Sequence, residues 1–490
     1  MRLSDLLSEA ERAGLPADPS ISGLTADSRE VTAGMLFAAL PGTQADGTRF
    51  IGSAVSSGAA ALLVATDAAV DPSVSVPVVR AADPRERLAH MAALYHAPQP
   101  AVAVAVTGTN GKTSVASFVE QIWRDRGLAS ASIGTLGLST AVAGADTLPH
   151  IGLTSPDPVT LHRALQGLAG VGVTHVALEA SSHGLAQRRL VGVRLAGGAF
   201  TNISRDHLDY HPTFEDYLTQ KMRLFRDLLP PGARAVINAD AEGGAAALAA
   251  SRDRGLEIVT VGRGEATIRM AEVAPTGSGL RLSVETRGGK HDLELPLVGA
   301  FQAWNAVQAA ALAAVEEGLT VDDTLPVLER LKGAVGRLEH VGTGPGGGDI
   351  YVDYAHTPDA LASALVALRP HCPGRLIVVF GAGGDRDPGK RPLMGAAARD
   401  HADLAIVTDD NPRNEDPAVI RRAVMDGVPS AVEVGDRATA IAEGVARLRA
   451  DDVLLVAGKG HETGQTVAGK VLPFRDHDAV RAALEDRKAS

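Results

Sequence analysis

The stretch "AVAVAVTGTNGKTSVASFVEQIWRDRG", residues 101–127, decides the fold of this chain. Its first six residues are apolar and have the length of a buried strand. The segment "TGTNGKTS" (107–114) then forms a glycine-containing turn, and the residues after it are typical of a helix. Strand, glycine turn and helix in this order are the opening of an α/β unit.

The glycine turn contains the residues of a phosphate-binding loop. Gly108 and Gly111 let backbone N–H groups approach phosphate oxygens, and the helix N-terminus adds about half a positive charge. Lys112 can reach the β- and γ-phosphates of a nucleotide, and Thr113 can bind Mg²⁺ through its hydroxyl. The usual eight-residue motif has glycine where this chain has Val106, so the loop is a variant. We expect a mononucleotide to bind at this turn.

Alternation of apolar runs and helical stretches continues through most of the chain. The apolar runs end in polar turns: "VTHVALEAS", "LAGGAFTNIS", "ARAVINAD", "DIYVDYA", "RLIVVFG", "ADLAIVTDD" and "DVLLVAGKG". This pattern predicts mostly parallel sheets with right-handed crossovers. Ligands bind beyond the carboxyl ends of the strands in such sheets. The unusual polar residues of this sequence lie at those ends.

Breaks in the pattern divide the chain into three α/β domains. The segment "YHAPQP" (95–100) reads as a linker, residues 266–297 read as β-rich, and "FQAWNAVQAAALAAVEEG" reads as a long helix. We expect an N-terminal domain over residues 1–97, a central phosphate-loop domain with a mostly parallel sheet over 98–335, and a C-terminal Rossmann-like domain over 336–490.

Composition excludes several classes of protein. The net charge of −11 argues against a general nucleic-acid partner, and the single cysteine, Cys372, excludes an internal disulfide. The first fifteen residues, "MRLSDLLSEAERAGL", read as an acidic amphipathic helix and not as a signal peptide. No apolar run approaches the ~20 residues that a membrane span needs. We expect a cytoplasmic monomer with no nucleic-acid or membrane partner.

The polar end of one apolar run, "TDDNPR" (408–413), has an ordinary interpretation when it is taken alone. Asn-Pro starts turns, and charged side chains solvate loops. A solvated turn is therefore the first reading, and the rest of the chain decides whether it holds.

Several motifs together resemble those of the Mur ligases. The loop "GTNGKTS" (108–114) is similar to the ATP loop of that family and of its folylpolyglutamate synthetase relatives. The other motifs are "EASSHGLAQRRL" (179–190), "TNISRDHLDYH" (201–211), "VDYAHTPDAL" (352–361), "GAGGDRDPGKRPLM" (381–394), "TDDNPR" (408–413) and "AGKGHET" (457–463). The combination of motifs covers all three expected domains. It is specific to the family, although each motif alone is not specific.

The resemblance implies an ATP-dependent acid–amino-acid ligase of cytoplasmic peptidoglycan precursor synthesis, with Mg²⁺ as cofactor. Such an enzyme adds meso-diaminopimelate to the D-glutamate γ-carboxylate of UDP-N-acetylmuramoyl-L-alanyl-D-glutamate. It forms an acyl phosphate and releases ADP and phosphate. The implied partners are therefore small molecules, and the N-terminal domain would hold the uridine nucleotide.

The resemblance also assigns the nucleotide and metal sites. The implied ATP-binding residues are Gly108, Thr109, Asn110, Gly111, Lys112, Thr113, Ser114, Asn305 and Arg337. The implied metal-site residues are Thr113, Glu179, His207 and Lys221, with Lys221 modified to N6-carboxylysine. The implied catalytic residues are Lys112, Glu179, His207, Lys221, Arg337 and Asp353, of which the C-terminal domain brings the last two to ATP on closure.

Several of these residues have an ordinary reading without the resemblance. Glu179 could be a solvated strand end, His207 a hydrogen-bonded core histidine and Lys221 a surface lysine on a helix. Arg337 could form a surface ion pair. Related chains often carry asparagine where this one has Gln302, so the role of Gln302 stays open.

The two remaining substrate sites are also implied by the resemblance. The UDP-muramoyl-dipeptide residues would be Ser28, Thr43, Gln44, Ala45, Thr154, Ser155, Ser181, Gln187 and Arg189. The diaminopimelate residues would be Arg386, Asp410, Asn411, Pro412, Arg413, Gly458 and Glu462.

Other interpretations remain open at this point. They are a ligase of the same family that adds L-lysine, a folylpolyglutamate synthetase, a mechanical or regulatory phosphate-loop NTPase, a Rossmann dehydrogenase and a non-enzymatic nucleotide-binding module. Folylpolyglutamate synthetases generally lack the N-terminal uridine domain and the "DNPR" turn. A dehydrogenase would have no use for Lys112 and Thr113.

Overall fold

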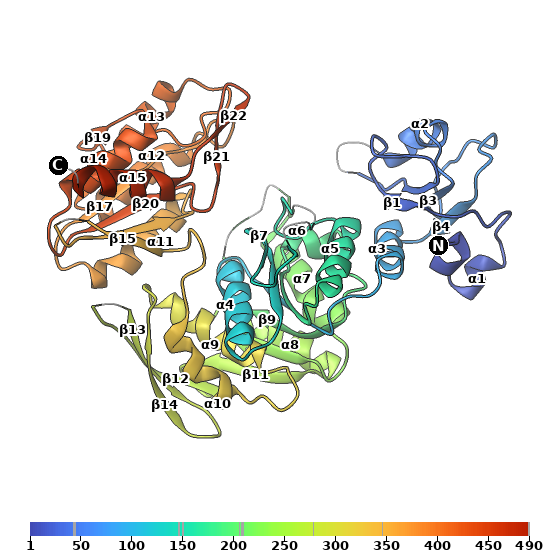
Figure 1. Cartoon of the computed structure of the whole chain (residues 1–490), viewed down its shortest axis with the longest axis horizontal. Helices are drawn as coiled ribbons and strands as arrows, with labels where there is room; N and C mark the ends of the chain where they lie inside the picture. Colours follow the sequence, from blue (N-terminus) through green and yellow to red (C-terminus); the bar gives the residue numbers. More distant parts are fainter. Residues whose placement is uncertain are drawn as a thin grey trace. The chain divides into compact units, whose positions relative to one another are not determined.

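A computed structural model describes residues 1–42, 46–145, 148, 151–204, 206, 210–277, 279–344 and 346–488, without the side chains of 486–488. The chain forms two compact units. The first comprises Met1–Ile268 and Gln308–Thr324, and the second comprises Arg269–Val307 and Leu325–Ser490. Mostly parallel sheets with helices confirm the α/β class (Figure 1). The domain boundaries stay a prediction.

The N-terminal part of the first unit contains a four-stranded parallel sheet in the order β1-β2-β3-β4. Its elements are η1 (Leu3–Leu6), α1 (Glu9–Arg12), β1 (Gly23–Thr25), β2 (Met35–Ala38), η2 (Gly47–Phe50), α2 (Ile51–Ser56), β3 (Ala61–Ala65), β4 (Val78–Ala81) and α3 (Pro84–Tyr95). The prediction of one amphipathic helix over residues 1–15 is wrong. Ser8 has an extended backbone and its N–H donates to the Glu11 carboxylate at 2.7 Å, so a new helix begins there.

The phosphate-loop sheet lies in the same unit. Its elements are β5 (Val102–Thr107), α4 (Lys112–Asp125), β6 (Ser130–Gly134), β7 (Gly137–Thr140), α5 (Pro158–Gly170), β8 (His175–Glu179), α6 (Ser182–Ala186), β9 (Leu195–Phe200), α7 (Phe214–Arg223), η4 (Leu224–Leu228), β10 (Arg234–Asn238), α8 (Gly244–Arg254) and β11 (Glu257–Gly262). The strands follow the order β11-β10-β9-β5-β8-β6-β7. All neighbours in this series are parallel except β6 and β7.

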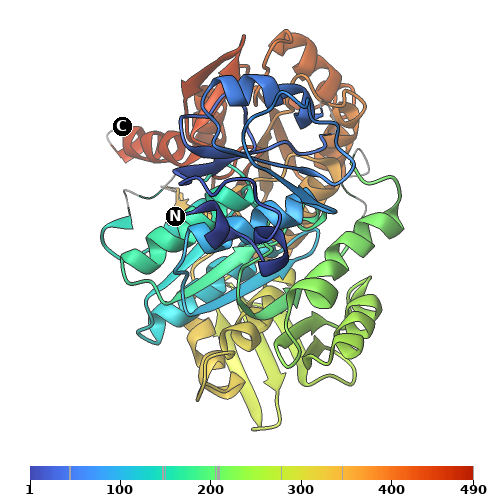
Figure 2. The same ribbon diagram turned by 90° about the vertical axis from the view of Figure 1, so that its right-hand side faces the viewer.

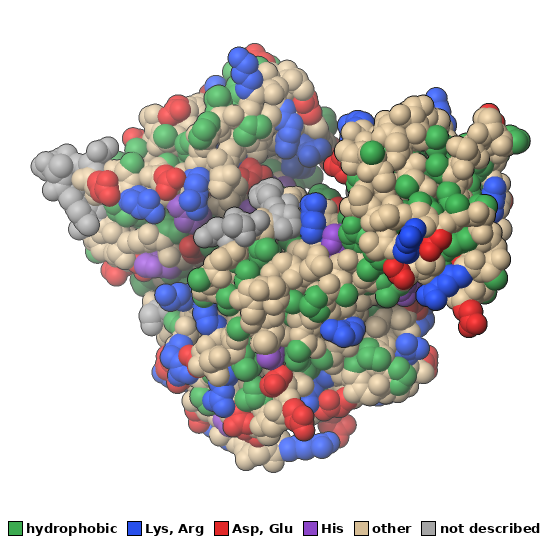
Figure 3. Space-filling model, turned by 45° about the vertical axis from the view of Figure 1, so that its right-hand side comes forward, with side chains coloured by type: hydrophobic (Ala, Val, Ile, Leu, Met, Phe, Trp, Pro, Cys, Tyr) green, Lys and Arg blue, Asp and Glu red, His purple; other side chains and the backbone are tan. Residues whose placement is uncertain are grey.

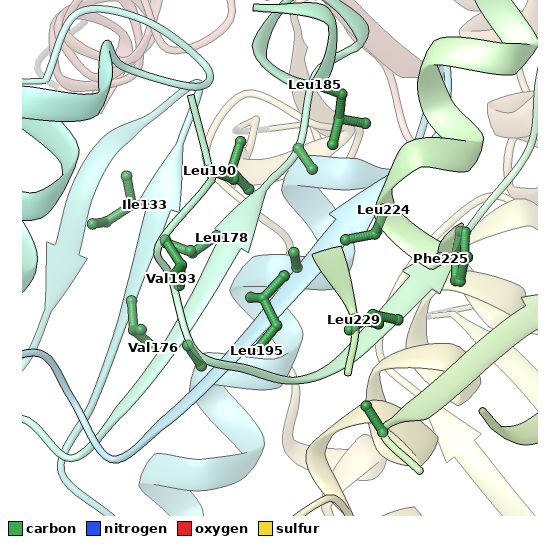
Figure 4. Packing of buried hydrophobic residues seen from close by; sticks show 14 of the residues in the cluster. Ile133, Val176, Leu178, Leu185, Leu190, Val193, Leu195, Leu224, Phe225 and Leu229 are labelled. Carbon is green, nitrogen blue, oxygen red and sulfur yellow. The ribbon is translucent and has the colours of Figure 1, made fainter. Parts of the chain in front are cut away.

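Apolar side chains from these strands and helices form one buried cluster (Figure 4). Val176, Leu178 and Leu195 come from β8 and β9, and Leu224 and Phe225 come from η4, the helical segment that follows α7. Because β5 lies between β8 and β9, this packing fixes the strand that carries the phosphate loop.

The second unit combines an antiparallel ribbon and a Rossmann-like sheet. Strands β12 (Ile268–Pro275), β13 (Leu280–Glu285) and β14 (Lys290–Leu295) form the ribbon, drawn in yellow-green in Figures 1 and 2. This confirms the predicted β-rich segment. Three helical segments follow in the chain: α9 (Phe301–Ala313), α10 (Val321–Thr324) and η5 (Leu325–Arg330). Residues 308–313 of α9 and all of α10 belong to the first unit. The predicted long helix is α9, and it ends at Ala313.

The C-terminal sheet has the order β15-β16-β20-β17-β18-β19. Its elements are β15 (Glu339–Thr343), β16 (Asp349–Asp353), α11 (Pro358–Leu368), η6 (Arg369–His371), β17 (Leu376–Phe380), α12 (Lys390–His401), β18 (Leu404–Val407), α13 (Pro417–Met425), β19 (Val432–Glu433), α14 (Arg437–Arg447), β20 (Val453–Ala457), β21 (Gly464–Val467), β22 (Lys470–Pro473) and α15 (Asp476–Lys488). β15 is antiparallel to β16, and the other neighbours are parallel. The carboxyl ends of β16, β20, β17 and β18 therefore meet at one edge.

Figure 3 shows one face of the molecule with its side chains coloured by type. Acidic and basic side chains are interspersed on that face. Within the described ranges, the structure contains no helix with the length and apolar character that crossing a bilayer requires.

Candidate active site

The phosphate loop connects β5 to α4 and is held by the chain that follows β9. Thr109 N–H donates to Asn202 O at 2.9 Å, and Asn110 N–H donates to the Asn202 side-chain oxygen at 3.0 Å. Lys112 Nζ donates to the carbonyls of Gly108 and Thr109 at 2.9 and 2.8 Å. The loop is thus pre-formed, and its lysine lies over it.

Lys221 is buried beside the same loop, with an exposed fraction of only 1%. Its Nζ donates to Gly108 O at 2.7 Å and lies 4.4 Å from the centre of the Tyr217 ring. Burial, and after it the nearby Lys112, lowers the pKa of Lys221 well below its usual value. The ordinary reading as a surface lysine is therefore wrong.

Tyr217 fixes this corner of the site. It lies one helical turn before Lys221 on α7, and its hydroxyl is 3.0 Å from Thr109 Oγ1. The ring therefore contacts both the phosphate loop and the buried lysine. Neither the family motifs nor a propensity argument singled out Tyr217, because only the fold brings it to the loop.

Glu179 ends β8 beside Val106 of β5, so its backbone lies next to the start of the loop. It is buried, and its two oxygens accept from Thr135 N at 2.8 Å and Thr135 Oγ1 at 3.1 Å. The solvated strand end is therefore excluded as the reading of Glu179. Thr135, in the turn after β6, is a site residue that sequence reasoning missed.

The proposed muramoyl-dipeptide residues of the first unit form one hydrogen-bonded network. Thr154 Oγ1 lies 3.0 Å from Thr135 Oγ1, and Ser155 Oγ donates to Glu179 O at 2.8 Å. Ser181 N–H donates to Ser155 Oγ at 3.0 Å. The network joins these residues to Glu179 and Thr135.

Arg189 continues this network. Its guanidinium donates to Ser155 O at 2.5 Å and to Gln187 Oε1 at 2.8 and 3.2 Å. Gln187 Nε2 in turn donates to the Tyr210 hydroxyl at 3.1 Å. The five predicted residues from Thr154 to Arg189 are therefore brought together.

Four predicted residues, Thr43, Gln44, Ala45 and His207, lie outside the described residues. Ser28 is half-buried in the turn after β1. Thr113 and Ser114 are buried at the start of α4, directly after the loop.

In the second unit, Asn305 and Gln302 are both buried on α9. Asn305 Nδ2 donates to Gln302 Oε1 at 2.9 Å. Gln302 therefore holds the Asn305 amide through its Nδ2, which leaves the Asn305 carbonyl oxygen outside this bond.

Arg337 and Asp353 lie together in the second unit. Asp353 accepts from Leu338 N at 2.7 Å and from Ala355 N at 2.8 Å. Burial raises the pKa of Asp353, and the nearby Arg337 opposes this shift. The Arg337 guanidinium lies 4.9 Å from the centre of the Tyr354 ring.

Most of the predicted amino-acid site lies where β16, β20, β17 and β18 end. Asn411 Nδ2 donates to Glu462 Oε2 at 2.9 Å, and both contact the buried Lys459. Asp410 is buried, and its Oδ2 has no hydrogen-bond partner among the residues that the structure describes. Gly458 lies against this carboxylate, because a Cβ there would overlap Asp410 Oδ2.

The "DNPR" turn packs against the loop after β17. Arg413 adopts φ +53° and donates through Nη1 to Gly384 O at 2.7 Å. Gly384 N–H donates to Asn411 O at 2.9 Å, and Pro412, which lies between Asn411 and Arg413, is buried. Arg386 is exposed on the same loop. The "DNPR" turn is therefore bonded to the loop after β17 and is not a free solvated loop.

Gly384→Ala tests this packing. A Cβ at Gly384 would overlap Pro412 O, a backbone atom that cannot move without shifting the turn. We expect the variant to lose about 1–3 kcal/mol of unfolding free energy and to bind the amino acid less tightly, measured by urea unfolding and initial rates. Gly389→Ala is the matched control, since its nearest neighbour is a movable Asp387 oxygen at 3.2 Å. Equal stability of the two variants would contradict the expectation.

Comparison with known proteins places this geometry in a family. The Mur ligase family catalytic domain matches residues 20–96, the Mur ligase middle domain matches 106–313, and the Mur ligase glutamate ligase domain matches 336–460.

Individual relatives are similar over nearly the whole chain. A protein of Chelativorans sp. (strain BNC1), named UDP-N-acetylmuramoyl-L-alanyl-D-glutamate–2,6-diaminopimelate ligase, is 53% identical over 97% of both chains. A Caulobacter vibrioides protein of the same name is 52% identical over 99% of both. A solved structure with that name in its title is 33% identical, covers 96% of both chains and has a TM-score of 0.70. The chain therefore belongs to the Mur ligase family.

Proposed function

We propose that the chain is the ATP-dependent ligase that adds meso-diaminopimelate to the D-glutamate γ-carboxylate of UDP-N-acetylmuramoyl-L-alanyl-D-glutamate. The observation that carries this proposal is the full-length similarity, at 53% identity, to a relative with that name. The enzyme acts in peptidoglycan precursor synthesis, and we place it in the cytoplasm because ATP and uridine nucleotides are available there. Residues 1–97 would bind the uridine nucleotide, 98–335 ATP and 336–490 the amino acid.

The first step activates the acid. A γ-carboxylate oxygen forms a bond to the γ-phosphorus of ATP, and ADP leaves with the electrons of the broken P–O bond. Phosphoryl transfer depends mainly on positioning and charge stabilisation. Gly108 and Gly111 of the pre-formed loop would let the backbone approach the phosphate, and Lys112 would exchange its carbonyl contacts for it. Arg189, Ser155 and Thr154 would hold the acid beside them.

The second step forms the amide. The neutral amine of the amino acid attacks the acyl carbon, and the tetrahedral intermediate expels phosphate while the nitrogen loses a proton. The edge formed by the ends of β16, β20, β17 and β18 presents the residues that would hold the amino acid. Arg413 suits a carboxylate, since its guanidinium is a planar two-donor fork.

A Mg²⁺ ion fits the oxygen donors beside the loop. Thr113 offers a hydroxyl and Glu179 a buried carboxylate, which suit an ion that one or two carboxylates and substrate phosphates hold. His207 would complete the set, together with Lys221 as a carbamate. When bound, Mg²⁺ would neutralise charge that develops on the phosphate oxygens.

We propose that Lys221 is carbamylated. A neutral amine forms an N–C bond with CO₂ and loses one proton, giving an anion. Burial lowers the pKa of Lys221, which favours the neutral form of its amine. The Nζ atoms of Lys112 and Lys221 share the Gly108 carbonyl, so an anionic carbamate on Lys221 would be attracted to the Lys112 ammonium.

Lys221→Ala tests this modification. We expect ligation to fall by at least about 10²-fold, because a charge that organises the phosphates is lost. Added short-chain carboxylates should restore part of the rate by replacing the anion. Intact-mass and ¹³C-bicarbonate NMR measurements should show the carbamate in wild type only. Full activity of the variant, or no labelled carbamate in wild type, would contradict the proposal.

The overall function is tested by phosphate release from ATP. Release should require both UDP-N-acetylmuramoyl-L-alanyl-D-glutamate and meso-diaminopimelate, and mass spectrometry should detect the tripeptide product. Preference for L-lysine would identify the lysine-adding ligase instead. Release with folate substrates and glutamate would identify a folylpolyglutamate synthetase.

A further inference from the structure

Lys459 is a fully buried lysine at the amino-acid end of the second unit. It lies two residues after the end of β20, and its exposed fraction is 0%. Its Nζ donates to Glu462 Oε2 at 2.7 Å and to Asn411 Oδ1 at 3.2 Å. Lysine is almost never fully buried unless it is paired, because removing an ammonium group from water is costly. The two residues that pair with this ammonium group, Asn411 and Glu462, therefore show what it does.

The first partner, Asn411, has its amide orientation fixed by this contact. Its Oδ1 accepts from Lys459 Nζ and from Thr466 N at 2.9 Å. Its Nδ2 donates to Glu462 Oε2 at 2.9 Å. A flipped amide would turn NH₂ toward the ammonium and oxygen toward a carboxylate, so the observed orientation is the only one that these partners accept.

The second partner, Glu462, has one oxygen engaged in this way. Both the Lys459 and the Asn411 bonds end on Oε2, which leaves Oε1 outside them. The Glu462 side chain is 31% exposed, so part of the carboxylate can be reached from outside. A carboxylate oriented through one oxygen can accept from a ligand through the other.

Asp410 lies close to the same group. Its main-chain oxygen accepts from Gln465 Nε2 at 2.7 Å, which holds the turn, while its Oδ2 is buried without a partner among the described residues. A Cβ on Gly458, the residue before Lys459, would overlap Asp410 Oδ2, so this carboxylate lies beside the loop that carries Lys459 and Glu462. Two acceptor oxygens, Asp410 Oδ2 and Glu462 Oε1, therefore lie where β18 and β20 end.

We propose that Lys459 is a positioning residue for the amino-acid substrate: its buried ammonium orients Asn411 and Glu462 so that Glu462 and Asp410 accept from an ammonium group of a diamino acid. This inference rests on the proposed function and adds a residue to it. Lys459 is fully buried and would act through Asn411 and Glu462.

The test compares Lys459→Met with wild type in initial-rate ligation assays. The KM for meso-diaminopimelate should rise by about 10- to 100-fold, the usual cost of removing a group that orients ligand contacts. The KM values for ATP and for the muramoyl dipeptide should not change. Arg375→Ala is the control, since it breaks the 2.6 Å pair between Arg375 and Asp452. These two residues precede β17 and β20, so they lie at the strand ends away from the amino-acid site. This control should lower the melting temperature and leave the KM for the diamino acid unchanged.

The outcomes separate this inference from the function on which it rests. Wild type that does not ligate meso-diaminopimelate would overturn the proposed function. Active wild type together with an unchanged KM in Lys459→Met would overturn the positioning role alone. A lower kcat and melting temperature with unchanged KM would show a purely structural lysine and would also overturn it. If Lys459→Met does not fold, Lys459→Gln keeps a hydrogen-bonding head and should raise the same KM, and an unchanged value would overturn the inference.

Discussion

Lys112→Ala should abolish ligation and the release of phosphate from ATP. In the structure Lys112 Nζ is held over the loop by the carbonyls of Gly108 and Thr109, so the γ-phosphate would meet it without rearrangement of the loop. Removing one preorganised donor to a developing charge costs roughly 10²- to 10³-fold in rate. Lys112 carries a full charge, so we expect a loss at the upper end of that range or beyond it.

The measurement is coupled phosphate release with both other substrates saturating. Lys290→Ala is a suitable control because Lys290 is an exposed lysine of β14 that pairs with Asp292 at 3.0 Å, and it should retain the wild-type rate. Melting curves of both variants should match wild type. Near-normal ATP turnover by Lys112→Ala would show that the nucleotide does not bind at this loop.

Sequence patterns predicted the strands, and therefore the places where they end, well. Apolar runs identified β5, β8, β16, β17, β18 and β20, and the rule that ligands bind at the carboxyl ends of parallel strands selected the residues after them. Glu179 and the "DNPR" turn were found in this way. The signal is strong because a strand buried on both faces must be apolar, so the first polar residue is conspicuous.

Contacts made across the fold could not be predicted in the same way. Lys221 looks like an exposed helical lysine, and only the packing of α7 beside the phosphate loop buries it. Thr135 follows a different strand from Glu179, and Lys459 reaches its partners from another loop. Local sequence fixes the elements, but the pairing of side chains depends on which strand ends become neighbours.

The break between η1 and α1 has a local cause that the amphipathic pattern does not reveal. The first fifteen residues are amphipathic, which favours one helix, but Ser8 and Glu11 form a capping arrangement that starts a helix at Glu9. A serine three residues before a glutamate is a known start signal. It was available in the sequence and outweighs the amphipathic pattern.

Arg413→Ala should reduce the use of meso-diaminopimelate and leave muramoyl-dipeptide binding intact. meso-Diaminopimelate differs from L-lysine by one carboxylate, so an enzyme that discriminates between them needs a cation at the far end of its pocket. Arg413 is half-buried and aimed by the turn at Pro412, and its Nη1 already donates to Gly384 O at 2.7 Å. The other nitrogens of the guanidinium remain to meet a carboxylate as a planar fork.

The expected size of the effect follows from the cost of an unpaired group. Losing one partner of a buried charge pair costs on the order of 2–5 kcal/mol. The kcat/KM for meso-diaminopimelate should fall by that amount, mainly through KM. A site built to pair a polar group can reject the analogue that lacks it by roughly 10⁴-fold. Wild type should therefore discriminate strongly against L-lysine, and the variant should lose most of that discrimination.

Initial rates with both amino acids, on wild type and on Arg413→Ala, measure the ratio directly. Arg422→Ala is the control, because Arg422 is an exposed arginine of α13 whose Nε donates only to Ala418 O in the preceding helical turn at 3.2 Å. It should behave as wild type with both substrates. If wild type prefers L-lysine, or if Arg413→Ala keeps the wild-type ratio, the packed turn at the end of β18 serves the fold alone, and the cation that selects the amino acid must be sought elsewhere on that edge, with Arg386 as the next residue to replace.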